Sequence, residues 1–341
     1  MRKNAVRVLR RLLLVAAALY LVLAAAAGIT IAEVSLKLPH RPLQHQQEVA
    51  AAARNQFHAE LQNVSITAAD GIVLRAWYVH PPASNGSAVV LLHGITDNRE
   101  GVAGYAGLFL QHGYSVLLPD ARAHGESGGV LATYGIKESD DFHRWVSWLY
   151  EHDPPQSAHS GANSAREWGP CVYGFGESYG AALTLQSLTV EKRLCAVAVE
   201  SPFSTAQAMS YERVSGPLHL KPWFGKTFAR PVIWSAVLYA RLRYGVNLLQ
   251  PSPLEAVRRS ATPVLLIHGA NDISILAYHS QLIAQAAPDH VQLWLVPNAG
   301  HTQAWRAAHQ EFERRVLGWF ASHQKIDRQI ANSVIPAESL P

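Results

Sequence analysis

Apolar and polar positions divide the chain into three regions. Residues 12–32 form an uninterrupted, mostly apolar stretch without a charge. From residue 62 to about residue 322, short apolar runs alternate with segments of helical spacing, which is typical of a parallel sheet covered by helices on both faces. Residues 323–341 show no such pattern, and we expect a flexible tail there.

The alternating region begins with two β-rich runs, 64–67 and 72–79, on either side of Asp70-Gly71, which predicts a hairpin. The strands expected after it are 88–92, 115–119, 171–175, 194–199, 263–267 and 291–296. Expected helices cover 102–111, 137–152, 181–186, 275–286 and a last segment that ends near residue 320. Residues 154–168 are polar and indicate a loop.

The alternation stops over residues 203–260, where no strand is obvious. This segment lies between two strands, where a short helix would suffice, so we predict a helical cap insertion. Simple packing of these side chains into the core is the alternative. The large side chains of the segment are Trp223, Phe224, Phe228, Ile233, Trp234, Tyr239 and Tyr244.

Length and composition fit one large α/β domain with attachments, since 49% of the 341 residues are hydrophobic and 16% are charged. The formal net charge is +4, but five positive residues precede the first acid, Glu33, so the rest of the chain carries about −1. These five are Arg2, Lys3, Arg7, Arg10 and Arg11. The positive charge therefore indicates membrane topology and argues against nucleic-acid binding.

The apolar stretch 12–32 has 21 residues and would extend about 30 Å as a helix, enough to cross the hydrocarbon of a bilayer. A cleaved signal peptide is the alternative, because Ala24–Ala27 offers small residues for processing. The stretch is longer than a usual signal core, so we expect an uncleaved transmembrane anchor, with a cytoplasmic N-terminus and a catalytic domain on the periplasmic or extracytoplasmic side. The predicted division is a basic segment and anchor over 1–33, a tether over 34–61 and the main domain over 62–322.

Only two cysteines are present, Cys171 and Cys195, and both lie in runs that indicate buried strands. We expect two core thiols. A disulfide is the alternative if the two strands are neighbours, because both cysteines stand near strand starts and the expected compartment is oxidising.

Ser178 is the central chemical candidate. It lies in Gly176-Glu177-Ser178-Tyr179-Gly180, between an apolar run and a helix-compatible segment. A serine on such a sharp strand-to-helix turn needs small residues two positions before and after it, which Gly176 and Gly180 supply. The turn places the hydroxyl near a helix N-terminus, where developing negative charge is favoured. Taken alone, a glycine-rich turn without catalysis is the alternative.

A nucleophilic serine needs a base, and the base needs a carboxylate that holds its tautomer. His301 follows the predicted strand 291–296 and Asp272 follows 263–267, so both fall at the same sheet edge as Ser178. Taken singly, Asp272 could cap a helix and His301 could lie on the surface. Their convergence with the serine favours a catalytic triad.

Acyl transfer also needs two N–H donors for the oxyanion. The N–H of Tyr179, directly after the nucleophile, is one candidate. The second is expected from Ile95, in the turn after strand 88–92, where Gly94 allows tight backbone passage. We interpret His93 as a residue that shapes this turn, not as a catalyst.

These features together resemble the α/β-hydrolase superfamily, in particular its lysophospholipase-like and serine-aminopeptidase-like branch, over about residues 62–322. The matching segments are 91–94, 120–128, 176–180, 266–272 and 300–301. The resemblance implies a mostly parallel eight-stranded sheet with helices on both faces, Ser178 as nucleophile, Asp272 as acid, His301 as base, and Ile95 and Tyr179 as oxyanion donors. Some relatives take the acid from the strand after the nucleophile, where this chain has Glu200.

We therefore expect a membrane-anchored serine hydrolase that cleaves a small-molecule or lipid-like carboxylic ester or thioester. An amidase or peptidase is one alternative, in which Glu212 or Glu255 would receive a free amine. A non-catalytic ligand-binding or partner-binding relative is the other. We expect no cofactor, no metal and no nucleic-acid partner, because the chain lacks His-x-x-x-His, paired cysteines and Gly-x-x-x-x-Gly-Lys.

Overall fold

The computed structural model describes residues 2–153, 171–215 and 222–324. The predicted loop 154–168 and the tail from residue 325 lie outside them. The chain separates into two compact units. The smaller unit comprises Met1–Leu38 and Thr205–Pro251, and the larger unit comprises Pro39–Ser204 and Ser252–Pro341.

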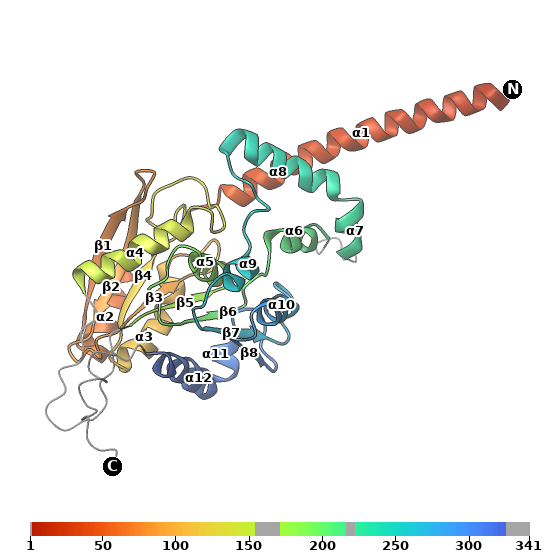
Figure 1. Ribbon diagram of the computed structural model, residues 1–341. Helices are drawn as coiled ribbons and strands as arrows, with labels where there is room; N and C mark the ends of the chain where they lie inside the picture. Colours follow the sequence, from red (N-terminus) through yellow and green to blue (C-terminus); the bar gives the residue numbers. More distant parts are fainter. Residues whose placement is uncertain (1, 154–170, 216–221, 325–341) are drawn as a thin grey trace, which may run out of the picture. The chain divides into compact units, whose positions relative to one another are not determined.

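The larger unit is built on an eight-stranded sheet with the order β1-β2-β4-β3-β5-β6-β7-β8 (Figure 1). The strands are β1 (Glu60–Thr67), β2 (Val73–His80), β3 (Ala88–Leu92), β4 (Ser115–Pro119), β5 (Val172–Glu177), β6 (Val197–Glu200), β7 (Val264–Gly269) and β8 (Val291–Val296). β2 pairs antiparallel with β1 and with β4, and every later neighbour pairs parallel. The predicted fold class, a mostly parallel eight-stranded sheet, is confirmed.

Helices cover both faces of this sheet (Figure 1). One face packs against α2 (Gln46–Phe57), α3 (Ala103–Gln111) and α12 (His309–Ser322). On the other face lie α4 (Glu138–His152) and α5 (Tyr179–Ser187). Short or peripheral helices complete the unit: the 3₁₀ helix Arg99–Val102, α9 (Pro253–Arg258), α10 (Tyr278–Ala286) and α11 (Ala304–Ala307).

The burial pattern explains why the central strands read as continuous apolar runs. All residues of β3 and β4 are buried, because helices cover both of their faces. The core on the α3 and α12 side is largely aromatic, with Phe109 and Phe320 stacked at 5.7 Å and Tyr173 stacked on Phe320 at 4.3 Å. Aromatic pairs at such separations add to the free energy gained by burial.

The region predicted as a tether contains α2, which packs on the core. Ala53 is buried in the core cluster, and Val49 and Phe57 pack against it. From Pro39 onward, these residues therefore belong to the larger unit.

Cys171 and Cys195 form a disulfide, with their Cα atoms 5.8 Å apart. Our expectation of two core thiols was wrong. β5 and β6 are adjacent parallel strands, and the Cys195 N–H donates to the Val172 carbonyl at 3.0 Å, so the strand starts lie within bridging distance.

All regular secondary structure in the described residues of the smaller unit is helical. It contains α1 (Arg2–Leu36), α6 (Ala206–Ser215), α7 (Pro222–Thr227) and α8 (Arg230–Tyr244), and α8 packs along α1 (Figure 1). Within the described residues α1 is long and apolar enough to cross a membrane, from Lys3 to Leu36. A signal sequence near the N-terminus can pass the same test of length and composition. The predicted insertion 203–260 thus forms helices, of which α9 belongs to the larger unit.

Candidate active site

Ser178 occupies a strained turn between β5 and α5. Its φ of 51° and ψ of −112° lie in a region that residues other than glycine rarely adopt. The Ser178 N–H donates to the Glu200 carbonyl at 2.8 Å, which ties the turn to the end of β6. The strain is held in place by the surrounding sheet and helix, as expected for a nucleophile turn.

The two flanking glycines are required by backbone crowding. A Cβ on Gly176 would stand 2.5 Å from the Gly180 carbonyl oxygen, and a Cβ on Gly180 would stand 2.2 Å from the Leu92 carbonyl oxygen. Both separations are far below van der Waals contact. A side chain at Gly176 would therefore displace the start of α5, and a side chain at Gly180 would push the turn away from the end of β3.

The structure brings Ser178, His301 and Asp272 into one hydrogen-bonded chain. His301 Nε2 lies 2.8 Å from Ser178 Oγ, and His301 Nδ1 lies 2.7 Å from Asp272 Oδ2. Asp272 follows β7 and His301 follows β8, so both side chains reach the carboxyl edge of the sheet where β5 ends. The arrangement allows His301 to take a proton from the serine hydroxyl while the carboxylate holds the ring.

Asp272 is buried and fully engaged. Its Oδ1 accepts hydrogen bonds from the Ser274 and Ile275 amides at 2.8 and 2.9 Å, and His268 Nε2 lies 3.4 Å from Oδ2. Burial alone would raise the pKa of Asp272, but the hydrogen bonds from His268, His301 and the Ile275 amide outweigh it and hold the pKa below its usual range. Asp272 therefore stays an anion beside His301.

The expected oxyanion donors flank the serine. Tyr179 is the first residue of α5, where an N–H has no partner within the helix. Ile95 lies in the turn after β3, and a Cβ on the adjoining Gly94 would stand 3.9 Å from Ser178 Cβ, so this turn passes beside the nucleophile. The buried His93 holds the turn, because its Nδ1 donates to the Gly94 carbonyl at 2.7 Å and its Nε2 accepts from the Ala121 N–H at 3.1 Å.

Glu200, the alternative acid, has other partners. Its Oε1 accepts from the Ala304 N–H at 2.8 Å, and the Tyr105 hydroxyl lies 3.3 Å from its Oε2. The same hydroxyl lies 3.4 Å from Glu177 Oε2, because Glu177 and Glu200 are register partners on β5 and β6. Burial and then repulsion by Glu200 raise the pKa of Glu177 to about 8, and burial raises the pKa of Glu200 to about 7.

The side chain of Tyr179 is held by Glu138, in the first turn of α4. Its hydroxyl donates to Glu138 Oε1 at 3.2 Å, and its ring lies 5.3 Å from the His124 ring. Glu138 also accepts from the Thr133 N–H at 2.6 Å and the Gly135 N–H at 2.8 Å. The residue after the nucleophile is thus fixed through its side chain as well as its backbone.

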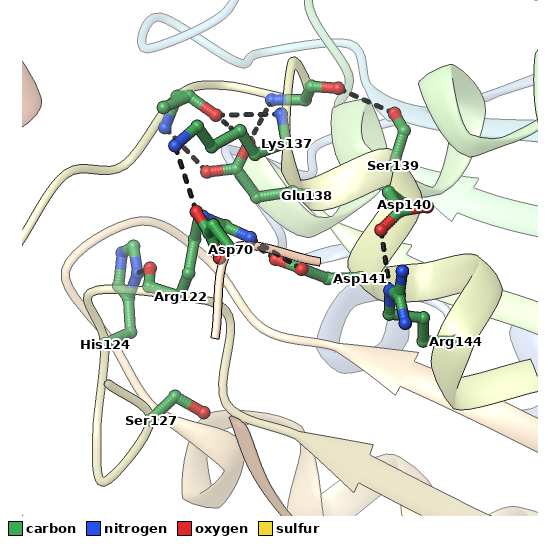
Figure 2. Close-up of polar contacts among 12 residues, drawn as sticks. Asp70, Arg122, His124, Ser127, Lys137, Glu138, Ser139, Asp140, Asp141 and Arg144 are labelled. Carbon is green, nitrogen blue, oxygen red and sulfur yellow. Dashed lines mark hydrogen bonds and ion pairs between the residues drawn. The ribbon is translucent and has the colours of Figure 1, made fainter. Parts of the chain in front are cut away.

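A charged cluster holds the start of α4 against the loop after β4. Figure 2 shows Arg122 between Asp141 and Asp70, with Lys137 on the far side of Asp70. Arg122 makes two parallel hydrogen bonds to Asp141, at 2.6 and 2.7 Å, and one to Asp70 at 2.9 Å. Two-pronged arginine–carboxylate pairs of this kind fix orientation as well as position.

Sequence reasoning did not identify three supporting residues: Tyr105, Glu138 and His268. Tyr105 and Glu138 act on residues distant in sequence, whereas His268 stands only four residues before its partner Asp272. None of the three has a local pattern that separates it from core or helix-start residues. Glu138, in the first turn of a predicted helix, has the composition of an ordinary helix start. Across the described residues no cluster of three or more metal-ligating side chains is present.

Comparison with known proteins agrees with the fold. The family model described as "Alpha/beta hydrolase family" matches residues 89–315. The uncharacterized protein YqkD of Bacillus subtilis is 25% identical over 253 residues, which cover 74% of this chain and 76% of that protein. Polyketide transferase ATR5 of Stachybotrys chlorohalonatus is 29% identical over 65% of this chain and 71% of its own.

Among solved structures, the Pyrococcus furiosus esterase Pf2001 superposes with a TM-score of 0.61 at 23% identity, covering 84% of this chain and all of that one. The acylaminoacyl peptidase of Pyrococcus horikoshii superposes with a TM-score of 0.55 at 17% identity, over 77% of this chain and 41% of its own. Both likenesses concern the fold. With the family model spanning most of the sheet, the chain belongs to the alpha/beta hydrolase family.

Proposed function

We propose that the protein is a membrane-anchored serine hydrolase that cleaves a carboxylic ester or thioester through an acyl-Ser178 intermediate. The observation that carries the proposal is the hydrogen-bonded chain from Ser178 Oγ through His301 to Asp272, at 2.8 and 2.7 Å. A non-catalytic, ligand-binding relative would need neither these hydrogen bonds between serine, histidine and aspartate nor the strained serine turn.

The proposed reaction has two halves. Ser178 Oγ attacks the carbonyl carbon while His301 Nε2 takes its proton, and the oxyanion is stabilised by the N–H groups of Tyr179 and Ile95. His301 then returns the proton to the leaving alcohol or thiol. In the second half, His301 activates a water that attacks the acyl group and frees the serine.

Ester or thioester cleavage is favoured over cleavage beside a free amine, because one of the two candidate carboxylates for such an amine is already paired. A peptidase that binds a free amine needs an uncommitted carboxylate. Glu255, one of the two candidates, pairs with Arg258 at 2.9 Å and with Arg259 at 3.6 Å on its own helix. Because an esterase and an acylaminoacyl peptidase both share the fold, the fold itself does not choose between them.

Anchoring is supported by α1 and by the disulfide. Large apolar side chains from Leu12 to Leu23 are exposed, as in a helix surrounded by lipid, and five cations precede this stretch. A disulfide forms and persists in an oxidising compartment, which agrees with a catalytic domain on the extracytoplasmic side. Cleavage near Ala24–Ala27 would remove part of the helix against which α8 packs, so a retained anchor is favoured.

The test is labelling of the detergent-solubilised full-length chain with a fluorophosphonate probe, followed by turnover of p-nitrophenyl esters of increasing acyl length. We expect labelling of the wild type and none of Ser178→Ala. The p-nitroanilide of the best acyl group is the matched amide, and we expect slower turnover of it. Failure of a folded wild-type chain to label would refute the hydrolase proposal, and faster anilide turnover would move the substrate class to amides.

A further inference from the structure

His301 stands in a short connection between β8 and α11. The next residue, Thr302, has a φ of 51°, in the left-handed region that β-branched residues rarely adopt. A backbone conformation of this kind persists only where the surrounding structure holds it. The position of His301 opposite Ser178 therefore depends on contacts between this connection and the rest of the larger unit.

The first of these contacts is a hydrogen bond to the carboxyl group of Glu200. Both ring nitrogens of His301 are engaged by Ser178 and Asp272, but those bonds orient the ring and leave the backbone of the connection to be fixed separately. Three residues beyond His301, the buried Ala304 donates its N–H to Glu200 Oε1 at 2.8 Å. Ala304 begins α11, so its N–H has no acceptor within the helix, and Glu200 supplies one.

The second contact is aromatic. The ring of Trp305, directly after Ala304, stacks on the ring of Tyr105 in α3, with 4.8 Å between the ring centroids. The Tyr105 hydroxyl in turn lies 3.3 Å from Glu200 Oε2. Tyr105 and Glu200 thus contact each other as well as the end of the histidine connection. We call these two residues the histidine seat.

Glu200 also holds the nucleophile, through its backbone. Its carbonyl oxygen accepts the Ser178 N–H at 2.8 Å, and the N–H of the following Ser201 donates to the Ile267 carbonyl on β7 at 2.9 Å. Glu200 is fully buried and is the last residue of β6, in the interior of the sheet. One residue therefore binds the serine turn with its backbone and the connection that carries His301 with its side chain.

An electrostatic role for Glu200 is the alternative, because a nearby anion favours the protonated form of His301. The contact geometry favours a positional role. The bond from Glu200 goes to a backbone N–H, and the carbonyl oxygen of a neutral carboxyl or of an amide accepts such a bond as well. Burial raises the pKa of Glu200 to about 7, so both protonation states occur near neutral pH and both can hold Ala304.

We propose that Glu200 is a positioning residue, which sets the separation of Ser178 and His301 by holding the serine turn with its carbonyl group and the Ala304 N–H with its carboxyl group. The inference rests on the proposed serine hydrolase function and gives Glu200 a role other than that of the catalytic acid. What the site requires of Glu200 is the reach of an acceptor oxygen, and not a charge.

The test compares three variants of the detergent-solubilised full-length chain by kcat and KM for the p-nitrophenyl ester of best acyl length. Glu200→Gln keeps the length and the acceptor oxygen, so its kcat should stay within about tenfold of wild type. Glu200→Asp keeps the charge but is one methylene shorter, and Glu200→Met keeps the length but has no acceptor oxygen. Each of these two should lower kcat by about 10²-fold, the cost of a misplacement of about 1 Å. KM should stay within about threefold, because the fully buried Glu200 does not reach the substrate.

Glu191→Asp is the matched control, because it shortens another fully buried glutamate by the same methylene. Glu191 lies in the turn between α5 and β6, where it accepts the Arg193 N–H at 2.7 Å. This variant should leave kcat within about twofold of wild type. A fall in kcat as large as that of Glu200→Asp would mean that activity follows stability in general, and would overturn the proposal.

The ranking of the glutamine and aspartate variants decides between position and charge. If Glu200→Asp is as active as Glu200→Gln or more active, the charge matters and the proposal is overturned. Wild-type kcat in all three variants, or a change confined to KM, would overturn it as well while the hydrolase function stands. No ester turnover by the folded wild type would refute the hydrolase function itself. Urea unfolding midpoints show which variants are folded, and the glutamine and aspartate variants suffice if Glu200→Met is not.

Discussion

The carboxyl pair of Glu177, which is partly buried, and Glu200, which is buried, makes a measurable prediction about stability and pH. In the folded chain burial, with repulsion from Glu200, raises the pKa of Glu177 from 4.5 to about 8. In the unfolded chain the same group has the ordinary value. Below pH 4.5 both states hold the proton, so the group makes no difference to the free energy of unfolding.

Above that pH, unfolding releases the proton from Glu177, so the folded chain loses stability as the pH rises. The slope is about 1.4 kcal/mol per pH unit for one group, and it levels off once the folded group also ionises, near pH 8. The full loss is therefore about 3 to 5 kcal/mol. Because Glu177 and Glu200 repel each other, they titrate as a pair and their losses do not add.

Glu177→Gln removes the charge at every pH and relieves Glu200 of its neighbour. The test compares urea unfolding of the detergent-solubilised full-length chain, followed by tryptophan fluorescence, at about pH 5 and about pH 8.5, two values that span most of the expected loss of stability. Relative to wild type, the variant should gain about 3 kcal/mol of stability between the two pH values. The comparison between pH values cancels any pH-independent effect of exchanging carboxyl for amide.

Glu151→Gln, at an exposed position near the end of α4, is the control and should show no such difference. The same free-energy difference between Glu177→Gln and wild type at both pH values would refute the reasoning. It would mean that the carboxyl pair is ionised in the folded chain and stabilised by contacts other than those described.

Three further predictions concern the site and its support. Asp272→Asn should lower kcat by about 10⁴-fold in ester assays through loss of the correct His301 tautomer, whereas Glu200→Gln should stay within about tenfold of wild type; the reverse ranking would make Glu200 the acid. Replacing Cys171 and Cys195 together by alanine should lower the free energy of unfolding by about 3 kcal/mol, because the bridge closes a loop with a separation of 24 residues, and an unchanged urea midpoint would contradict this. Gly180→Ala should abolish fluorophosphonate labelling, because the added Cβ would stand 2.2 Å from a backbone oxygen, and normal labelling would show that the turn is not confined as described.

The strands and the order of the candidate triad could be predicted because their signals are local. The run 88–92 is continuously apolar and bounded by turn residues, and it matches β3. Asp272 and His301 follow such runs directly, and parallel strands carry their ends to one edge of a sheet. Strand boundaries were predicted less accurately where burial extends beyond the hydrogen-bonded part of a strand. Residues 194–196 are buried, but β6 begins only at Val197.

What could not be predicted depends on partners distant in sequence. The stripe of Ala24, Gly28 and Ala32 reads as part of a uniformly apolar helix, and its meaning appears only when α8, some 200 residues later, packs on it. The disulfide depends on β5 and β6 being neighbours, which their sequences do not specify. In the same way, the sequence around Glu138 indicates only an ordinary helix start, and its hydrogen bond to the Tyr179 hydroxyl depends on the fold.

The bridge between Cys171 and Cys195 also has a consequence for how the protein is made. In the proposed topology both cysteines leave the cytoplasm as thiols and are joined only after translocation. The presence of the disulfide therefore shows that a molecule has been exported. A molecule retained inside the cell keeps two extra hydrogens, and intact-mass measurement tells the two populations apart. In the sequence, Cys171 precedes and Cys195 follows the strand, turn and helix that carry Ser178. The bridge therefore closes a loop that contains the nucleophile.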